Sequence, residues 1–507
     1  MSSFLLIKQL ELFDLQFSNN PKHLNYEQLS VGGWKESSVW VSYLQKTDLP
    51  VTTQTPSSNL PGTHDARRYF EYFRQRSVVE FSGYFDSNFW DQLILQVSHD
   101  DPAVCHAVIA LGSLYEKFDG QRELIRPHAQ ATVCRQDSIE QYNQALGHLR
   151  QNLGDNENRN VQSTLICRVH IIAFETFLGN YDSGGLHLEN GLKILHDWQV
   201  QQDQLLQSTL SSGTSMIEDD LLPVFSHLNL QATSLVDPGL SEHHRFIGDT
   251  ATKSIPSAFS SLNQSRICLY NLFNATFDFI HSTYDIKESV NLFEEPPSAV
   301  VLERHHLDGL MQRWLQTFDT LLQVSGTQMG TRELRAAMLL KIHHTTAIIL
   351  PRASLNPEQC AFDVHLNHFR SSLSLSASLV EAPGSLEIRP SFSMDLGVIV
   401  HLYLTVVNCR DPAVRRQALS LLSRLSLPRQ EGTWNANDAS RVGQWVIDVE
   451  EEGLGAVESA EDVPESSRIQ RIDANAYMEE RLVHLRHVLD DESESSEPDV
   501  EENTEDQ

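Results

Sequence analysis

His99, Asp100 and Asp101 form the first group of side chains in this sequence that could do chemistry. A metal-dependent phosphohydrolase uses such a His-Asp pair with a further histidine and a distant aspartate, which neighbouring helices bring to one metal ion. Here Asp101 stands directly before Pro102 and an apolar stretch, "AVCHAVIALGSLYEKF". Aspartate followed by proline is typical of a helix N-terminus, where the carboxylate caps the first turn. We therefore interpret Asp100 or Asp101 as a helix cap and His99 as a surface residue.

Histidines recur elsewhere as doublets and close pairs, which chance makes common in a chain with 22 histidines. The doublets lie at 243–244, 305–306 and 343–344, and His365 and His368 form a further pair. Glu303 and His306 make one Glu-x-x-His motif, but a di-iron bundle needs two such motifs and two more carboxylates. Because the second motif is absent, we expect these histidines on the surface or at the edge of the core.

Other motifs that would indicate catalysis are also missing from the sequence. It contains no P-loop, no Gly-x-Ser-x-Gly nucleophile motif and no His-Glu-x-x-His zinc motif. We therefore assign no catalytic, cofactor-binding or metal-binding residue and no cofactor, and we expect a protein that is not an enzyme.

The cysteines are dispersed and do not form a metal-binding or redox motif. No two of them make a Cys-x-x-Cys pair, and several lie in apolar helical stretches, as buried free thiols do. This usage favours a reducing intracellular compartment. The six cysteines are Cys105, Cys134, Cys167, Cys268, Cys360 and Cys409.

The net charge of −30 disfavours direct nucleic-acid binding, because the phosphate backbone repels an acidic surface. The two groups of arginines, 67–76 and 410–416, are interleaved with apolar residues, so we interpret them as solvated helix faces rather than a basic patch. No apolar run approaches the roughly 18 residues that a membrane helix needs. We therefore expect neither nucleic-acid binding nor membrane insertion from this chain.

Hydrophobic periodicity predicts helices through most of the sequence. Val104, Val108, Leu111 and Tyr115 recur at the 3.6-residue period of one helix face, and further helices are expected at 137–153 and 161–178. The second of these is apolar all round, which indicates a central buried helix. Gly179 fits the position after its end, and a helix at 185–198 completes an antiparallel hairpin. The β-branched stretch "VIVHLYLTVVNC" has no alternating partner nearby and is also assigned to helix.

These elements predict an all-α fold, a helical array or bundle of packed antiparallel helices with a disordered acidic C-terminal tail. We expect a weakly ordered leader and linker at 1–65, an all-α domain at 66–455, a linker and short helix at 456–489, and the tail at 490–507. That tail holds ten acidic residues and no basic one, so it has little to bury and repels itself.

Several stretches together resemble the regulatory region of fungal zinc-cluster transcription factors. They include "YFEYFRQRSVVEFSGYFDSNFWDQLILQVSHDDPAVCHAVIALGSLYE", "SIEQYNQALGHL", "LICRVHIIAFETFLGNYDSGGLHLENGLKILHDW" and "MDLGVIVHLYLTVVNCRDPAVRRQALSLLSRLSLPRQEGTWNA". The likeness runs in order over residues 66–455. It implies an all-α regulatory domain, often nuclear, in proteins that control fungal gene sets such as those of secondary metabolism.

The sequence departs from that family at the DNA-binding module, which needs six cysteines within roughly 30 residues and presents a helix to the major groove. Residues 1–104 contain no cysteine, and the dispersed cysteines cannot form this cluster. Two explanations are open: a natural regulator without its own DNA reader, or a chain that begins late through truncation or a gene model that misses an exon.

The sequence therefore predicts a nuclear transcription regulator that acts through protein partners. A DNA-binding zinc-cluster paralogue or the transcription machinery would be such a partner, and a homo- or heterodimer is compatible with the sequence. The alternative is a cytoplasmic helical scaffold or accessory protein of a metabolic gene cluster. The acidic tail fits either recruitment of transcription machinery or simple solvation. The aromatic stretch at 270–284 could line an effector pocket, but core packing explains it better.

Overall fold

The computed structural model describes residues 63–85, 88–120, 136–154, 161–206, 217–234, 255–283, 296–356, 358–381, 391–425, 429–477 and 482–488. Residues 1–62 of the leader that we expected at 1–65 lie outside the described residues. The acidic tail expected at 490–507 also lies outside them. Helices dominate the described part, which confirms the all-α prediction. None of the described helices combines the length and apolar character that crossing a membrane requires.

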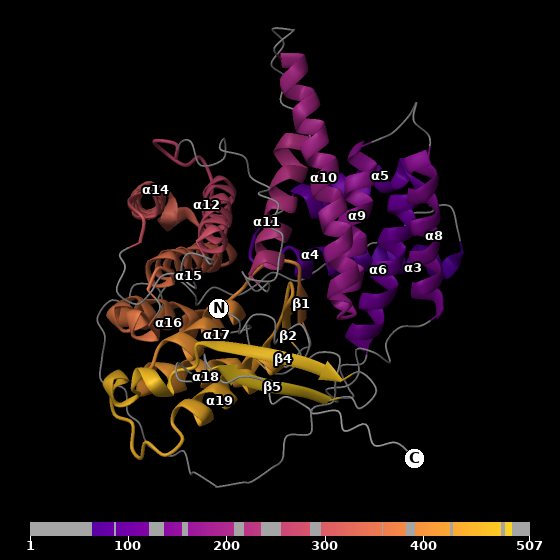
Figure 1. The fold of residues 1–507 in the computed structure, drawn as a ribbon. Helices are drawn as coiled ribbons and strands as arrows, with labels where there is room; N and C mark the ends of the chain where they lie inside the picture. The colour runs from indigo at the N-terminus through magenta and orange to yellow at the C-terminus, as the bar shows by residue number, and fades with distance from the viewer. Residues whose placement is uncertain are drawn as a thin grey trace, which may run out of the picture.

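The first half of the described chain forms an N-terminal helical bundle (Figure 1). Helix α6 lies at its centre and packs against α3, α8 and α9, while α9 also pairs with α10. Its apolar interior, here called the N-terminal core, includes Phe73, Phe81, Leu111, Phe177 and Phe225. The helices are α3 (His64–Tyr72), α4 (Val78–Phe81), α5 (Ile94–Asp100), α6 (Pro102–Gly120), α8 (Gln136–Gly154), α9 (Val161–Phe177) and α10 (Tyr181–Leu206), with π-helical turns η1 (Phe73–Ser77) and η2 (Phe89–Leu93).

Helix α9 is the central buried helix that the sequence predicts. Every residue from Ser163 to Phe177 is buried, so its polar side chains need internal partners. Glu175 accepts hydrogen bonds from Asn180 Nδ2 at 2.9 Å and Ser183 Oγ at 3.0 Å, which fixes the turn into α10. Gly179 has a φ of +77° in this turn, as its predicted place after the helix requires.

The second half of the chain builds a further set of packed helices around the C-terminal core, which includes Leu269, Trp314, Leu340, Tyr403 and Trp434. In Figure 1, α12, α14 and α15 lie opposite the N-terminal bundle, α16 to α19 lie below them, and α11 stands between the two sets. The elements are η4 (Ile217–Leu221), α11 (Leu222–Thr233), α12 (Leu262–Ser282), α14 (Ser298–Ser325), α15 (Thr331–Ser354), α16 (Leu366–Glu381), α17 (Ile399–Asn408), α18 (Pro412–Leu425) and α19 (Ala436–Glu450), with 3-10 turns η5 (Gly326–Gln328) and η6 (Gln359–His365).

A small mixed sheet joins the two cores. Strand β1 (Ser391–Ser393) pairs in parallel with β2 (Arg429–Glu431), which pairs antiparallel with β3 (Trp434–Asn435). The ring of Phe392 lies 4.8 Å from that of Phe177 and 5.4 Å from that of Phe81, both in the N-terminal core. Trp434 belongs to the C-terminal core and donates from Nε1 to Ser234 Oγ at 3.2 Å.

The segment 456–489 differs from the linker and short helix that we expected. It contains two 3-10 turns, η7 (Ala460–Asp462) and η8 (Glu465–Ser467), and an antiparallel hairpin of β4 (Arg471–Tyr477) and β5 (Leu482–Val488). In "RIDANAY" every second residue is Ile or Ala, and a period of two favours a strand over a helix. The stretch "VIVHLYLTVVNC" is helical as predicted, because α17 is buried on all sides and packing overrides its β-branched composition.

Candidate functional site

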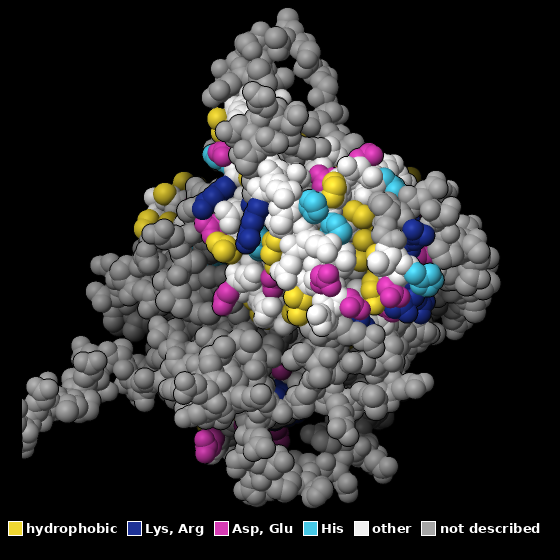
Figure 2. Space-filling model, turned by 90° about the vertical axis from the view of Figure 1, so that its right-hand side faces the viewer, with side chains coloured by type: hydrophobic (Ala, Val, Ile, Leu, Met, Phe, Trp, Pro, Cys, Tyr) yellow, Lys and Arg dark blue, Asp and Glu magenta, His cyan; other side chains and the backbone are white. Residues whose placement is uncertain are grey.

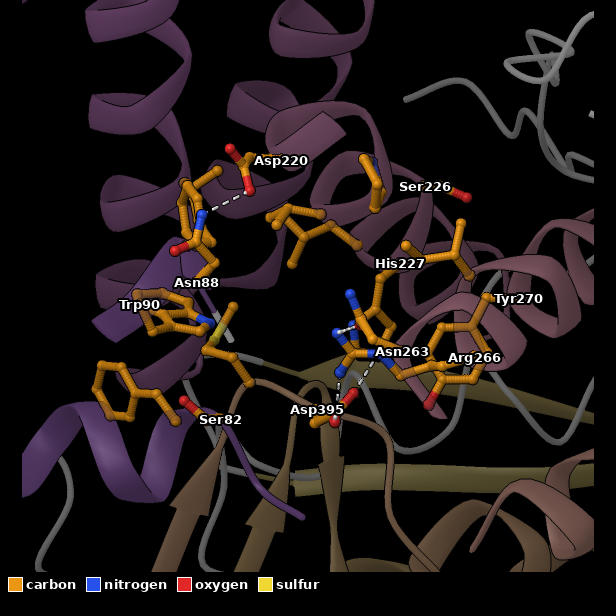
Figure 3. A pocket seen from close by; sticks show the side chains of 18 of the residues that line it. Ser82, Asn88, Trp90, Asp220, Ser226, His227, Asn263, Arg266, Tyr270 and Asp395 are labelled. Atoms are coloured by element: carbon orange, nitrogen blue, oxygen red, sulfur yellow. Dashed lines mark hydrogen bonds and ion pairs between the residues drawn. The ribbon is translucent and has the colours of Figure 1, made fainter. Parts of the chain in front are cut away.

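A cavity lined by polar and apolar side chains lies between the two cores, and we call it the interface pocket (Figure 3). Trp90 on η2 and Val224 and His227 on α11 form one part of its wall, and Arg266 on α12 and Asp395 after β1 form another. The centre of a water-sized molecule can occupy about 80 Å³ within it. One water needs roughly 10–15 Å³ by the same measure, so the pocket has room for several such groups.

Three ionisable side chains meet on one side of this pocket, where Figure 3 shows them joined by dashed lines. Asp395 Oδ2 lies 3.3 Å from Arg266 Nη1, and Asp395 Oδ1 lies 3.0 Å from His227 Nε2. The Arg266 guanidinium also donates to Asn263 Oδ1 at 3.0 Å and lies over the ring of Phe85, 4.4 Å from its centroid. The carboxylate of Asp395 therefore forms an ion pair with α12 through Arg266 and lies against α11 at His227.

Local backbone geometry places Asp395 at this point. Its amide donates to Ser393 Oγ at 3.0 Å, a tight turn that follows directly from β1. Gly83 adopts a φ of +56°, and a Cβ at this position would lie 3.1 Å from both Asp395 Cβ and Ser393 Oγ. A glycine is needed here because other residues rarely adopt positive φ and because the approach is so close.

Burial changes the ionisation of the pocket residues. Burial raises the pKa of Asp395 to about 6, with the nearby Glu431 also raising it and Arg266 opposing the shift. Burial, followed by the positive charge of Arg266 and the neighbouring His343, lowers the pKa of His227 well below its usual value. His227 is therefore neutral at pH 7. Its Nε2 accepts from the Leu396 amide at 3.3 Å, so this nitrogen carries no proton.

Tyr270 closes the same side of the pocket from α12. Its ring centroid lies 4.8 Å from that of His227 and 5.7 Å from that of His343. Burial raises the pKa of its phenol well above the usual value, so the hydroxyl stays protonated. This hydroxyl is buried and makes no hydrogen bond to any described residue.

The opposite rim is more open and is formed by neutral and acidic groups. Asn88 donates to Asp220 Oδ1 at 3.1 Å across the rim, as Figure 3 shows. Ser226 Oγ donates to Asn271 Oδ1 at 2.8 Å, which ties α11 to α12 behind the pocket. Side-chain amides thus connect the N-terminal bundle to η4, and α11 to α12.

The His-Asp-Asp triplet has the structural role that the sequence favours. Helix α5 ends at Asp100, and Asp101 Oδ1 accepts from the amides of Ala103 at 2.8 Å and Val104 at 3.4 Å at the start of α6. His99 is exposed, with its ring 6.0 Å from that of Phe70. No group of three or more metal-ligating side chains gathers among the described residues.

The other histidines divide between surface and core. His305 and His306 are exposed, as is Glu303, while the doublet 243–244 lies outside the described residues. His343 and His344 are buried rather than at the core edge, and their Nε2 atoms hydrogen-bond the carbonyls of Gly397 and Met311, each at 3.0 Å. His365 is buried and His368 is half-buried, with ring centroids 5.5 Å apart.

The two groups of arginines differ in how deeply they are buried. Arg74 pairs with Glu71 on the surface of the bundle, and Figure 2 shows basic, acidic, histidine and apolar side chains interspersed on this face without a basic patch among the described residues. Our expectation of a solvated face at 410–416 is wrong for Arg410 and Arg415, which are buried against Glu450. The carboxylate that makes this burial possible lies on another helix, so local sequence did not reveal it.

The sequence favoured core packing for the aromatic stretch 270–284 and did not predict the interface pocket. The aromatic stretch 270–284 does contribute Tyr270 to the wall, while Phe273, Phe277 and Phe279 pack in the C-terminal core. Arg266 and Asp395 were not singled out, because their contact joins positions 129 residues apart.

The described cysteines are all free, namely Cys105, Cys167, Cys268, Cys360 and Cys409.

Comparison with known proteins gives one family and two named relatives. The family described as "Fungal specific transcription factor domain" matches residues 68–427, which include most of both helical cores. The transcription regulator lscL of Purpureocillium lilacinum is 24% identical over 283 residues, 51% of this chain and 63% of the relative, so the chain spans less than two thirds of that protein. The aspercryptin biosynthesis cluster-specific transcription regulator atnN of Emericella nidulans is 19% identical over 497 residues, 81% of this chain and 78% of the relative. No solved structure matches the chain significantly.

Proposed function

The chain belongs to the fungal specific transcription factor domain family, and from this premise we propose that it regulates transcription of a biosynthetic gene cluster in the nucleus, through protein partners and without catalysis. The observation that carries the proposal is the extent of the family match, which runs across both cores from residue 68 to residue 427. The name of the relative atnN supports the cluster-specific part.

The electrostatics of the chain support the role of partners. A net charge of −30 opposes the approach to DNA, and the face shown in Figure 2 has no basic patch among the described residues. A protein with these properties reaches promoters most readily when a DNA-binding protein recruits it. A zinc-cluster paralogue and the transcription machinery are the two partner classes that we propose.

The test uses the full chain in its native host. Deletion of the gene should lower or raise the transcripts of one contiguous biosynthetic cluster, and the tagged chain should occupy the promoters of that cluster. The purified chain alone should bind those promoter fragments no more tightly than unrelated DNA at physiological salt. Partners cross-linked to the chain on chromatin should include a DNA-binding protein.

The outcomes separate the parts of the proposal. Specific promoter binding by the purified chain would refute recruitment and leave transcription control standing. Unchanged transcripts together with a cytoplasmic chain that occupies no promoter would refute transcription control and favour a scaffold for biosynthetic enzymes.

A further inference from the structure

One carboxylate of the interface pocket has no counter-charge among the described residues. Asp220 Oδ1 accepts from Asn88 at 3.1 Å, and no described lysine, arginine or histidine forms an ion pair with this side chain. Asp220 is half-buried, and its Oδ2 has no hydrogen-bond partner among the described residues yet remains accessible to solvent. A group inside the cavity can therefore reach a free carboxylate oxygen.

The other ionisable side chains that line the pocket do not balance this negative charge. Arg266 pairs with Asp395 at 3.3 Å, so these two charges compensate each other. His227 is neutral at pH 7, because burial lowers its pKa well below the usual value. No lysine belongs to the described wall of the cavity. The cavity therefore carries a net negative charge, which favours a cation and opposes an anion.

The positive and negative groups lie on different sides of the cavity. Figure 3 shows Asp220, Asn88 and Trp90 on one side, and Arg266 and Asp395 on the other. A guanidinium group repels a cation that is bound beside it, and the repulsion weakens with distance. A cation paired with Asp220 lies on the side away from Arg266, where this repulsion is weaker.

Aromatic rings form part of the wall on the side of Asp220. Phe89 and Trp90 line the cavity, and they directly follow Asn88, which bonds Asp220. Edge-on contacts hold the Trp90 ring, whose centroid lies 5.1 Å from that of Phe89 and 5.5 Å from that of Phe81. The face of an indole ring attracts an ammonium group within about 6 Å of its centroid. A carboxylate and an indole ring on one side of a cavity are therefore suited to an ammonium group.

The size and the apolar part of the cavity limit the rest of the ligand. The centre of a water-sized molecule can occupy about 80 Å³, which corresponds to roughly six water-sized groups. Pro223 and Val224 of α11 and Ile267 of α12 add apolar surface to the wall. Apolar walls with a few polar groups are typical of small-molecule sites. The cavity therefore has room for a single ring that carries a short charged arm.

We propose that the interface pocket binds a small organic cation, an ammonium group on a ring-sized apolar body, with Asp220 as its counter-ion. The ammonium group donates to Asp220 beside the ring of Trp90, and the body lies against Val224. Binding is a property of the purified chain, so it stands or falls separately from the proposed function in transcription.

The test uses benzylammonium as the probe, with benzyl alcohol and benzoate as single-ring compounds of similar size and different charge. Saturable binding to the purified full chain is measured by ligand-detected NMR at physiological salt, which screens the attraction of this acidic chain for cations elsewhere. Benzylammonium should bind with a dissociation constant of about a millimolar or below, and the other two at least about fivefold more weakly. No saturable binding of benzylammonium up to about 20 millimolar, or an equal or stronger affinity for benzyl alcohol or benzoate, would overturn the proposal.

A charge variant tests the role of Asp220. Asp220→Asn keeps an oxygen that accepts from Asn88 but removes the charge, so the affinity for benzylammonium should fall at least about fivefold while that for benzyl alcohol stays the same. Asp448→Asn is the matched control, because Asp448 is exposed and lies outside the pocket wall, and it should change neither affinity. The same affinity for benzylammonium in the two variants would overturn the assignment of Asp220 as the counter-ion.

A size variant places the binding in this cavity. Val224→Phe narrows the cavity from α11 and should weaken benzylammonium binding at least about fivefold. Val324→Phe, at a helical position 72% exposed, should leave the affinity unchanged. An unchanged thermal midpoint shows that the Val224→Phe protein is folded, and undiminished binding in that protein would overturn the assignment to this pocket.

Discussion

The side-chain amide of Gln430, on strand β2, donates to the backbone carbonyl of Thr176, near the end of helix α9, at 3.1 Å and across 254 residues of sequence. The same amide nitrogen lies 3.2 Å from the hydroxyl of Tyr181 at the start of α10. Strand β1, next to β2, sends Phe392 into the N-terminal core, while Trp434 on β3 packs in the C-terminal core. The small sheet therefore holds the two cores in one arrangement, and the interface pocket depends on that arrangement.

We expect Gln430→Leu to lower the free energy of unfolding by about 1–3 kcal/mol, because it leaves buried acceptors at Thr176 and Tyr181 without this donor. Urea denaturation of the purified chain measures the change. Gln444→Leu is the matched control, since Gln444 is exposed and its side chain donates to Asp448 one turn along α19. Equal losses in the two variants would contradict the bridging role of Gln430.

Two glycines in helices should respond to alanine in opposite directions. A Cβ at Gly112, on α6, would lie 2.1 Å from the backbone carbonyl oxygen of Tyr69, so Gly112→Ala must push α3 away. We expect this substitution to lower the free energy of unfolding by about 1–3 kcal/mol or more, as added volume does in a well-packed core. A Cβ at Gly147, on α8, would meet no neighbouring group within 4 Å. Gly147→Ala should therefore raise the free energy of unfolding by up to about 1 kcal/mol, because alanine has the higher helix propensity. Thermal unfolding distinguishes the two, and a stable Gly112→Ala protein would contradict the close packing of α3 on α6.

The parts of the fold that follow from local sequence were predictable. The cap at Asp101, the positive φ of Gly179 and the buried character of α9 each depend on residues within a few positions of one another. The interface pocket was not predictable in this way, because the Arg266–Asp395 pair and the close approach of Gly83 to Asp395 arise only after distant segments meet. The burial of Arg415 has the same cause, since its partner Glu450 lies on another helix.

Glu450 should be the most sensitive carboxylate in the C-terminal helices. It is fully buried, it accepts from Arg410 at 2.7 Å, from Arg415 at 2.6 Å and from the amide of Ile469 at 2.9 Å, and these partners hold its pKa below the usual value although burial opposes them. Glu450→Gln leaves the buried guanidinium of Arg410 without a counter-charge and that of Arg415 with only Glu451 at 3.9 Å, so it should lower the free energy of unfolding by about 3–5 kcal/mol.

The surface pair of Glu381 and Arg424 supplies the control for Glu450. Arg424 Nη1 lies 2.7 Å from Glu381 Oε1, but both side chains are largely exposed. Glu381→Gln should therefore lower the free energy of unfolding by less than about 1 kcal/mol. Denaturant titration of both variants under the same buffer gives the comparison. A similar small loss in both would show that the buried network contributes little to stability.

Buried histidines should make the folded chain sensitive to acid. Burial lowers the pKa of His170, His343 and His344 to about 4 and that of His401 to about 3. The unfolded chain takes up protons near pH 6.5 at these positions, whereas the folded chain does so only near pH 4 or below. Stability is therefore lost as the pH falls from about 6.5 to 4. Asp395 acts in the opposite direction, because its folded pKa of about 6 is raised above that of the unfolded chain.

His343 allows this acid sensitivity to be measured at one position. A shift of one pKa unit corresponds to about 1.4 kcal/mol, so His343 should account for about 3 kcal/mol of the stability lost between pH 6.5 and pH 4. Gln in its place can still donate to the carbonyl of Gly397 but does not titrate. The free energy of unfolding of His343→Gln should therefore fall by about 3 kcal/mol less than that of the unaltered chain over this range, while the exposed His305→Gln should follow the unaltered chain. Parallel pH profiles for His343→Gln and the unaltered chain would mean that His343 is not kept neutral by the fold.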